Sequence, residues 1–383
     1  MTTTFSHLAL ERRRSEACPS LERSRTPRRR HSWTTTTSWS AVRRRLLLVS
    51  VAGALAFVGL WLAIREGPRA AAAPSGAVEN VVLVTIDGVR WQEIFRGVDP
   101  ARAEAALLPK SAVVPASELL PNMTRLFFEG GTVLGDPSLA GGFSPSGPRY
   151  VSLPGYVELM TGATSECTTN DCIPSLGTTL PEELARGLAT SPGEVAVLAS
   201  WEVIARVSTG DRPGVLIVAG SAEGDEAPPY PGHGDYRADR ATRVLAIRHL
   251  VERRPRFMWV ALGDTDEWAH RGDYRGYLGA LRAADAFVGE LAAHLAEMGD
   301  YGRNTALFVT TDHGRGASFA DHGEGDSATT WLLARGPGIA ARGPSATASA
   351  RYLRDVAPTI RRLLQLPAHT CATCGEAIPE LLP

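Results

Sequence analysis

Three apolar stretches of this chain run directly into acidic or histidine residues. They are 81–86 before Asp87, 257–262 before Asp264 and Asp266, and 306–310 before Asp312 and His313. Apolar runs of this length, bounded by glycine or polar residues, are typical of buried parallel strands. Since ligands of open α/β sheets bind beyond the carboxyl ends of the strands, these three strand ends predict one shared site.

The remaining pattern alternates strands with helices. We expect further strands at 194–198, 215–219 and 329–333, and helices at 122–129, 180–187, 239–253, 274–298 and 352–364. Thr179 and Glu182 have the spacing of a capping box, which supports the helix that follows them. The alternation predicts an α/β fold, with a mostly parallel central sheet and helices on both faces.

A serine stands at a further predicted turn from strand to helix. The residues before it have the pattern of a short strand that ends at Ser152, and Pro154 suits the first turn of a helix. Ser152 would then lie at a helix N-terminus, where backbone N–H groups favour anions such as phosphate.

The N-terminal part of the chain has a different composition. Residues 1–45 hold eleven Arg and three Glu, a net charge of +8, and their lack of apolar periodicity predicts a disordered basic tail. Residues 46–64 carry no charge and, as a helix, would span about 28 Å, close to a bilayer core of about 30 Å. They are expected to form a transmembrane helix or the apolar region of a signal peptide. Arg43–Arg45 keeps the N-terminus cytoplasmic, so both alternatives export the rest of the chain to the periplasm or cell surface.

The exported part divides into a linker at 65–78, a folded domain at 79–367 and a C-terminal tail at 368–383. The whole chain has a net charge of −1, so the residues after the basic tail carry −9. A negative balance of this kind argues against a nucleic-acid-binding surface.

Four of the five cysteines form two local pairs, Cys167 with Cys172 and Cys371 with Cys374. Two short disulfides fit such spacing in an oxidising compartment. A redox or zinc-binding role for the second pair is the alternative that the spacing leaves open.

Four motifs occur in order along the predicted domain. They are Val-Thr-Ile-Asp-Gly-Val-Arg at 84–90, Ser-Leu-Pro-Gly-Tyr at 152–156, the Asp-x-x-x-His pair Asp266 and His270, and Thr-Asp-His-Gly at 311–314 followed by Asp-His-Gly at 321–323. Together they resemble the alkaline phosphatase superfamily, and most closely its nucleotide pyrophosphatase/phosphodiesterase-like branch. The resemblance covers roughly Val81 to Leu366, and it implies an alkaline phosphatase-like catalytic domain.

The resemblance also implies two divalent metal ions and a serine nucleophile. The ligands would be Asp87, Asp312, His313 and the Ser152 oxygen for one metal, and Asp266, His270 and His322 for the other. Ser152 would attack phosphorus and form a phosphoseryl intermediate. Independently of the family, a serine hydroxyl needs a base or a metal to act as a nucleophile. Mixed nitrogen and oxygen ligands favour Zn²⁺, with Mn²⁺ as the alternative.

The predicted function is therefore an exported, metal-dependent phosphoric ester hydrolase, either a phosphodiesterase or a phosphatase. A sulfatase is one alternative, although Tyr156 stands where that subfamily has Arg. An envelope phosphoryl or phosphoethanolamine transferase is another, and a catalytically silent metal-binding surface module is the alternative from a different class.

Several residues near the motifs have simpler interpretations. Taken alone, Asp87 reads as a turn residue and Ser152 as a helix cap, but the four motifs together favour a site. Asp264 is expected behind the metal ligands rather than among them. Asn170 lies at about the distance where relatives place a phosphate-contacting Asn, and Gly155 replaces the Asn that is common three residues after the nucleophile.

Overall fold

The computed structural model describes residues 77–188, 190–208, 214–221 and 235–383. The predicted basic tail, the 46–64 stretch and nearly all of the linker lie outside these residues. Among the described helices, none combines the length and the apolar character that crossing a bilayer requires. All elements discussed below belong to the unit formed by Ala70–Pro383.

An eight-stranded sheet runs through this unit in the order β5-β4-β6-β1-β7-β8-β2-β9. Its strands are β1 (Asn80–Ile86), β2 (Thr132–Leu134), β4 (Val195–Ala199), β5 (Leu216–Ala219), β6 (Phe257–Leu262), β7 (Thr305–Thr310), β8 (Leu332–Arg335) and β9 (Gly343–Pro344), while β3 (Phe143–Ser144) and β10 (Arg351–Tyr352) pair separately. Among the described strands, only β8 is antiparallel to its neighbours, β7 and β2. The predicted mostly parallel α/β sheet is thus confirmed.

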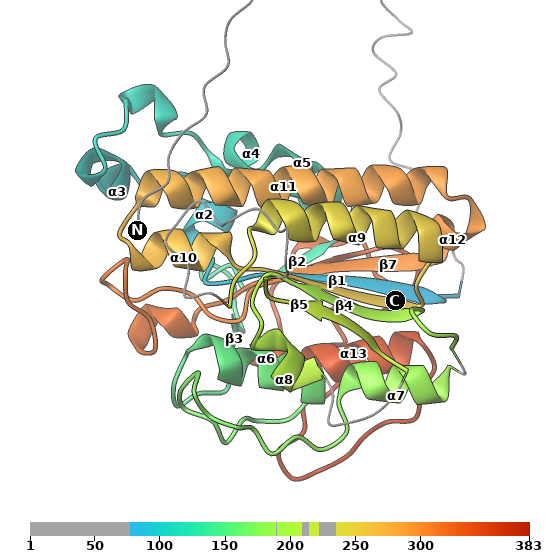
Figure 1. Cartoon of the computed structure of the whole chain (residues 1–383). Coiled ribbons are helices and arrows are strands. Elements are labelled where there is room, and N and C mark those ends of the chain that lie inside the picture. The colour runs from blue at the N-terminus through green and yellow to red at the C-terminus, as the bar shows by residue number, and fades with distance from the viewer. Residues whose placement is uncertain (1–76, 189, 209–213, 222–234) are drawn as a thin grey trace, which may run out of the picture. The chain divides into compact units, whose positions relative to one another are not determined.

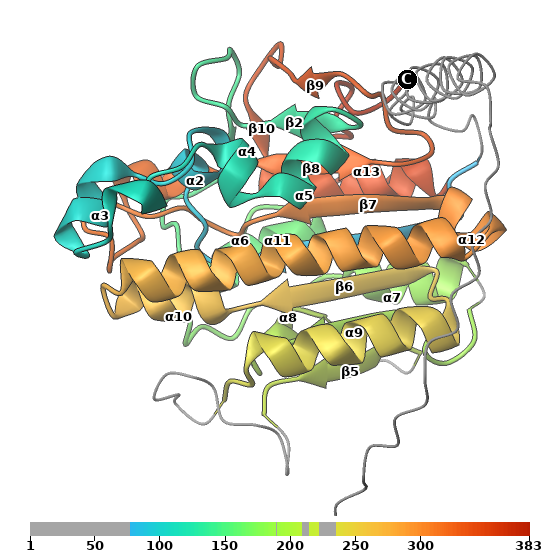
Figure 2. The ribbon, with the colours of Figure 1, turned by 90° about the horizontal axis from the view of Figure 1, so that it is seen from above.

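Helices cover both faces of the sheet (Figure 1). One face carries α9 (Asp239–Arg253), α10 (Asp264–His270) and α11 (Tyr274–Glu297), and the other carries α6 (Ser152–Thr161), α7 (Leu180–Gly187), α8 (Ile204–Ser208) and α13 (Val356–Leu363). Seen from above, α11 and α9 run along the strands (Figure 2). The shorter helices are α2 (Trp91–Phe95), α3 (Pro100–Ala105), α4 (Ala116–Leu119), α5 (Pro121–Met123) and α12 (Asp300–Arg303).

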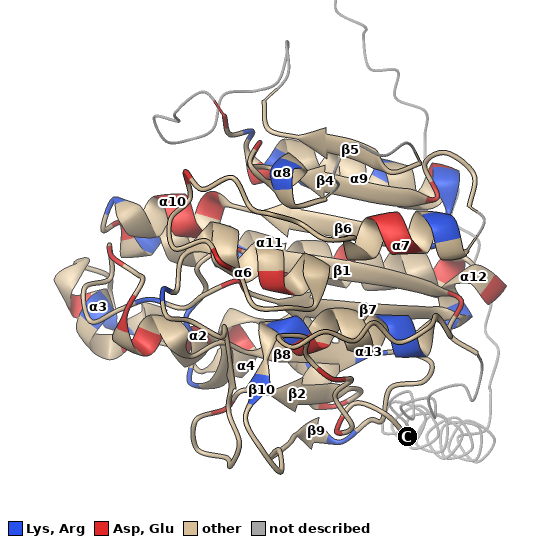
Figure 3. Cartoon of the chain, turned by 90° about the horizontal axis from the view of Figure 1, so that it is seen from below, with Lys and Arg blue, Asp and Glu red and all other residues tan. Residues whose placement is uncertain are grey.

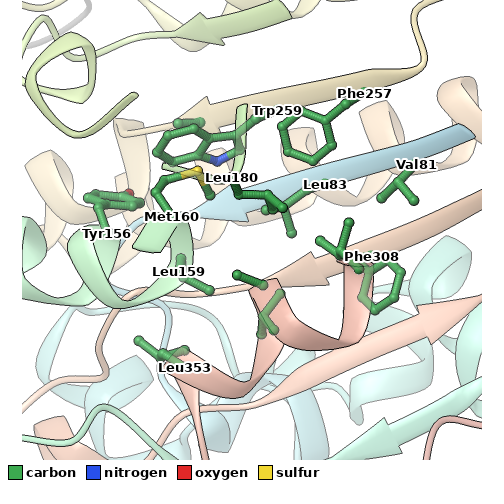
Figure 4. Packing of buried hydrophobic residues seen from close by; sticks show 14 of the residues in the cluster. Val81, Leu83, Tyr156, Leu159, Met160, Leu180, Phe257, Trp259, Phe308 and Leu353 are labelled. Atoms are coloured by element: carbon green, nitrogen blue, oxygen red, sulfur yellow. The ribbon is translucent and has the colours of Figure 1, made fainter. Parts of the chain in front are cut away.

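The central strands are apolar because both of their faces are buried. Val81 and Leu83 of β1 pack into the cluster beneath α6 and α13, whereas Val82 and Val84 pack into the cluster beneath α11. On the face that α6 and α13 cover, Trp259 of β6 lies against Tyr156 of α6, with ring centroids 5.7 Å apart (Figure 4). Strands β1, β4, β6 and β7 carry no Asp, Glu, Lys or Arg (Figure 3).

The structure corrects several predicted boundaries. The strand predicted at 329–333 is found at Leu332–Arg335, because Thr330 instead donates its backbone N–H to the Phe143 carbonyl. The helix predicted at 352–364 begins at Val356, after a 3-10 turn. The helix predicted at 122–129 is a short α5 followed by a π-helical stretch over Thr124–Phe128.

The segment before Ser152 also differs from the prediction. In the described chain no strand leads directly into this residue; Tyr150 forms an isolated bridge with Gly323, and α6 begins at Ser152 itself. The other local predictions are confirmed, since Glu182 accepts from the Thr179 N–H at 3.0 Å and both cysteine pairs form disulfides.

Candidate active site

Five segments bring the seven predicted site residues to one edge of the sheet. Asp87 follows β1, and Asp312 and His313 follow β7, the neighbouring strand. Ser152 begins α6 on one face, while α10 on the other face carries two more of the predicted residues one helical turn apart. The loop after β7 supplies the last one. The residues brought together are Asp87, Ser152, Asp266, His270, Asp312, His313 and His322.

The Ser152 hydroxyl lies between Asp87 and His313. Its Oγ is 3.4 Å from Asp87 Oδ1 and 3.1 Å from His313 Nε2. The other carboxylate oxygen of Asp87 accepts from the Tyr156 hydroxyl at 2.8 Å, one turn along α6. Tyr156 therefore fixes the orientation of the carboxylate that faces the serine.

His313 is buried and presents one nitrogen to the site. Its Nδ1 is 2.7 Å from the Gly314 carbonyl, so Nδ1 carries the proton and Nε2 holds a lone pair. Burial lowers the pKa of His313 to about 4, which keeps the ring neutral at pH 7. Nε2 faces Asp87 Oδ1 and Asp312 Oδ2, both at 3.5 Å, and Asp266 Oδ1 at 3.9 Å. A Ser-His-Asp triad would instead place its carboxylate on Nδ1.

Asp312 holds a buried oxygen without a hydrogen-bond donor. Gly88 donates its N–H to Oδ1 at 3.1 Å, whereas Oδ2 has no hydrogen-bond partner among the described residues. Burial, together with the Asp266 charge, raises the pKa of Asp312 to about 7. Burial, together with the charges of Asp312 and Asp266, likewise raises the pKa of Asp87 well above its ordinary value. These carboxylates repel one another unless a cation lies between them.

The second half of the site is a carboxylate with two imidazoles. Asp266 Oδ2 is 2.9 Å from His270 Nε2, and His270 Nε2 is 3.2 Å from His322 Nε2. His322 Nδ1 contacts the Tyr150 carbonyl at 3.2 Å, which leaves its Nε2 lone pair facing the site. Burial and the neighbouring His313 lower the pKa of His322 to about 3.

These donor atoms fit divalent metal ions. Two groups of residues place ligand atoms within 4.8 Å of one another: Asp266 with His270 and His322, and Asp87 with Asp266 and His313. The first group is the predicted ligand set of one metal. The second contains Asp266 where the prediction has Asp312, whose unpartnered Oδ2 nevertheless faces the same His313 nitrogen. The lowered pKa values of His313 and His322 keep both rings neutral at pH 7. Imidazole nitrogens and carboxylate oxygens are both ligands of Zn²⁺.

Arg315 is a site residue that the motifs did not identify. Its guanidinium is fully buried, and Nη2 contacts both Oδ1 and the backbone oxygen of Asp266, while Nη1 donates to the Ala320 carbonyl at 3.2 Å. Burial alone would raise the pKa of Asp266, but Arg315 and His270 hold it well below its ordinary value. Arg315 therefore leaves Oδ2 of Asp266 for a metal and ties α10 to the loop that carries His322.

Replacing Arg315 with methionine is expected to lower the unfolding free energy of the metal-free protein by about 3–5 kcal/mol. Asp266 would keep a buried charge whose buried cationic partner is lost, with only the more exposed His270 beside it. Denaturant unfolding in the presence of chelator measures this loss. Arg275→Met, at an exposed position of α11, is the control and should change the free energy by less than about 0.5 kcal/mol. Equal changes in the two variants would contradict the role given to Arg315.

The structure gives a reason for glycine at position 155, where relatives commonly have Asn. A Cβ atom at this position of α6 would lie 2.5 Å from the Asp312 carbonyl oxygen and 3.0 Å from the carbonyl carbon. The backbone at Asp312 thus passes close against the helix, and only glycine fits there.

We expect Gly155→Ala to destabilise the protein by about 1–3 kcal/mol through this overpacking. Gly279 is a matched control, since it is also helical and a Cβ there meets nothing within 4 Å. Gly279→Ala should stabilise by up to about 1 kcal/mol because alanine is the better helix former. Thermal unfolding of both variants tests this, and a shift in the same direction for both would contradict the close approach.

A cavity of about 600 Å³ opens in front of Ser152. Asp266 and His270 line it, and so do Trp201 and Tyr236, whose rings stack with centroids 5.7 Å apart. Asn170 lines it as well, and its Oδ1 accepts from the Leu153 N–H at 2.9 Å. No motif or spacing in the sequence indicated the aromatic pair. A cavity of similar volume beside β5 and α9 contains none of the predicted site residues.

Comparisons with known proteins show what this chain is similar to. The family model of the Metalloenzyme superfamily matches residues 238–368, which include five of the seven site residues, Asp266, His270, Asp312, His313 and His322. No similar sequence is found among curated proteins.

Solved structures share the fold at low identity. A phosphonate monoester hydrolase from Silicibacter pomeroyi has a TM-score of 0.51 at 16% identity, over 79% of this chain and 76% of that one. A putative sulfatase from Bacteroides thetaiotaomicron has a TM-score of 0.55 at 12% identity, over 79% and 74%. A protein of the alkaline phosphatase superfamily from Vibrio parahaemolyticus has a TM-score of 0.53 at 14% identity, over 81% and 72%. The family match and the shared fold together confirm that this chain resembles the alkaline phosphatase superfamily.

Proposed function

We propose that this protein is a metal-dependent phosphoric ester hydrolase with Ser152 as its nucleophile. The arrangement of Ser152 carries the proposal. Its hydroxyl lies at the N-terminus of α6, within 3.4 Å of Asp87 and 3.1 Å of His313, and it faces the cavity. Backbone N–H groups at such a helix terminus favour a bound phosphoryl group.

Different residues would bind the metal ions, attack phosphorus and contact the phosphoryl group. Asp87, Asp312, His313, Asp266, His270 and His322 would hold two divalent ions. When bound, such ions lower the pKa of oxygen nucleophiles and offset charge on the entering and leaving oxygens of an in-line displacement. Ser152 Oγ loses its proton and forms a bond to phosphorus as the bond from phosphorus to the leaving oxygen breaks, and the leaving oxygen takes up a proton and departs as the alcohol. Water then hydrolyses the phosphoseryl ester, which releases the phosphate and restores the Ser152 hydroxyl. Asn170, whose Oδ1 is occupied by Leu153, directs its Nδ2 donor to a phosphoryl oxygen.

A sulfatase is the competing function, because sulfatases are among the proteins with this fold. The sulfatase motif described above requires an Arg at the position where this chain has Tyr156. Here the Tyr156 hydroxyl donates to Asp87 within the site, so this position serves to orient a carboxylate. The difference favours phosphate over sulfate esters.

We further propose Zn²⁺ as the metal and an extracytoplasmic location for the domain. The imidazole and carboxylate donors support Zn²⁺. The two disulfides are bonds that persist in oxidising compartments, which supports export. Residues 46–64 would provide the membrane anchor or the signal peptide.

The proposal is tested by the hydrolysis of three chromogenic esters by the purified full chain: bis-p-nitrophenyl phosphate, p-nitrophenyl phosphate and p-nitrophenyl sulfate. We expect a higher kcat/KM for a phosphate ester than for the sulfate ester. The preferred phosphate ester separates a phosphodiesterase from a phosphatase. Preference for the sulfate ester would indicate a sulfatase, and turnover of none would favour a transferase or a silent module.

A further inference from the structure

A disulfide closes a small loop beside the nucleophile. Cys167 and Cys172 are bonded, and Asn170 lies within the ring that they close. Asn170 is the residue of this ring that reaches the active-site cavity, where it accepts from the backbone N–H of Leu153, the residue after the nucleophile. A covalent ring thus lies against the first turn of α6.

The contact with Leu153 fixes the orientation of the Asn170 amide. A backbone N–H can donate only to the carbonyl oxygen of an amide, so Oδ1 faces Leu153 and Nδ2 takes the other position. Nδ2 has no hydrogen-bond partner among the described residues, and its side chain lines the same cavity as Ser152. A donor held in this way, before the substrate arrives, is suited to the developing charge of an oxyanion.

The backbone of the ring does little to hold Asn170 in place. The backbone forms a turn at Asn170 and Asp171, but between residues 168 and 172 it makes no backbone-to-backbone hydrogen bond to the rest of the described chain. The ends of the ring are held instead by packing. Cys167 is 4% exposed within the apolar cluster beneath α6 and α13, and Cys172 packs against that cluster. The disulfide therefore restricts a loop that its own backbone would leave free.

We propose that the Cys167–Cys172 disulfide is a positioning element of the active site, which holds the Asn170 amide beside Ser152 as an oxyanion donor. This inference rests on the proposed function. Because the disulfide acts through Asn170, the two should behave as one unit, and their effects should not add.

The test is a cycle of variants of the full chain. Asn170→Ala, the double variant Cys167→Ala/Cys172→Ala and the triple variant are compared with the wild type. We expect each of the first two to lower kcat/KM on the preferred phosphate ester by roughly 10²-fold, as for the loss of one oxyanion donor. The triple variant should be no worse than Asn170→Ala alone. The matched control is Cys371→Ala/Cys374→Ala, which removes the other disulfide and should keep the wild-type kcat/KM.

The affinity for inorganic orthovanadate, measured by calorimetry, gives the same cycle without turnover. If the cysteine variant fails to fold, reductant is added to the Cys371→Ala/Cys374→Ala protein with and without Asn170→Ala, which confines reduction to one disulfide pair. Losses that add in the triple variant, or a wild type that binds no orthovanadate, would overturn the positioning role. A different outcome is that the wild type binds orthovanadate, the losses of affinity in the variants do not add, and no ester is cleaved. That outcome would contradict the proposed function and leave the positioning role supported.

Discussion

Ser152→Ala is expected to abolish turnover of phosphate esters, with a loss of kcat on the order of 10⁴-fold or more. The hydroxyl is the only atom group removed, and it is the one that would form the bond to phosphorus. Metal should stay bound, because the remaining carboxylate and imidazole donors do not depend on the serine oxygen. Kinetics and elemental analysis of the same preparation measure both effects.

The control for this variant is Ser208→Ala. Ser208 is also buried, but it lies in α8, and its hydroxyl donates to the Ile204 carbonyl of the same helix at 2.6 Å. Its loss should leave kcat within about threefold, consistent with a modest change in stability. Turnover that survives in Ser152→Ala would remove Ser152 from the mechanism, whatever the control shows.

Asp312→Asn is expected to cost both metal and activity. Even residues that only support a metal ligand change metal affinity by roughly 10–100-fold, so the loss of a ligand should exceed this. The unpartnered Oδ2 is the atom at issue, because an amide nitrogen in its place cannot coordinate a cation. Calorimetric titration with Zn²⁺ measures the affinity, and wild-type affinity in this variant would contradict the ligand assignment.

The same substitution should have the opposite effect on the metal-free fold. The pKa of Asp312 is raised from 3.8 to about 7 by burial and by Asp266, so in the chelated wild type the folded state binds the proton more tightly than the unfolded state. Stability from this group is therefore complete below about pH 4 and is lost as the pH rises to about 7. The amide that replaces the carboxylate does not ionise, so metal-free Asp312→Asn should exceed the chelated wild type in stability at pH 8. Thermal unfolding with chelator at pH 4 and pH 8 tests the sign.

The sheet could be predicted from the sequence because its central strands are buried on both faces. Such strands read as uninterrupted apolar runs, and 257–262 coincides with β6. The long helices α9 and α11 could also be predicted, from their length and from the spacing of their apolar residues. Short elements such as β2 and β9 could not be predicted, since two or three residues carry no periodic signal and their pairing is set by distant parts of the chain.

The predicted site residues were identified by motif, and the structure brings all seven together. What the motifs could not provide is the environment of those residues. Arg315 follows the Thr-Asp-His-Gly motif by one position, yet its contact with Asp266 depends on how α10 packs against a loop nearly fifty residues away. The stacking of Trp201 on Tyr236 likewise joins segments that are distant in sequence. The reason for glycine at 155 is visible only once α6 lies on the Asp312 backbone.

The most direct test of the central claim is the metal content of the purified full chain, measured together with ester cleavage before and after chelation. The account predicts about two divalent ions per chain, loss of phosphate ester cleavage when a chelator removes them, and recovery when Zn²⁺ is returned. A chain that holds no metal at pH 7, or that cleaves phosphate esters equally well in excess chelator, would contradict the two-metal site.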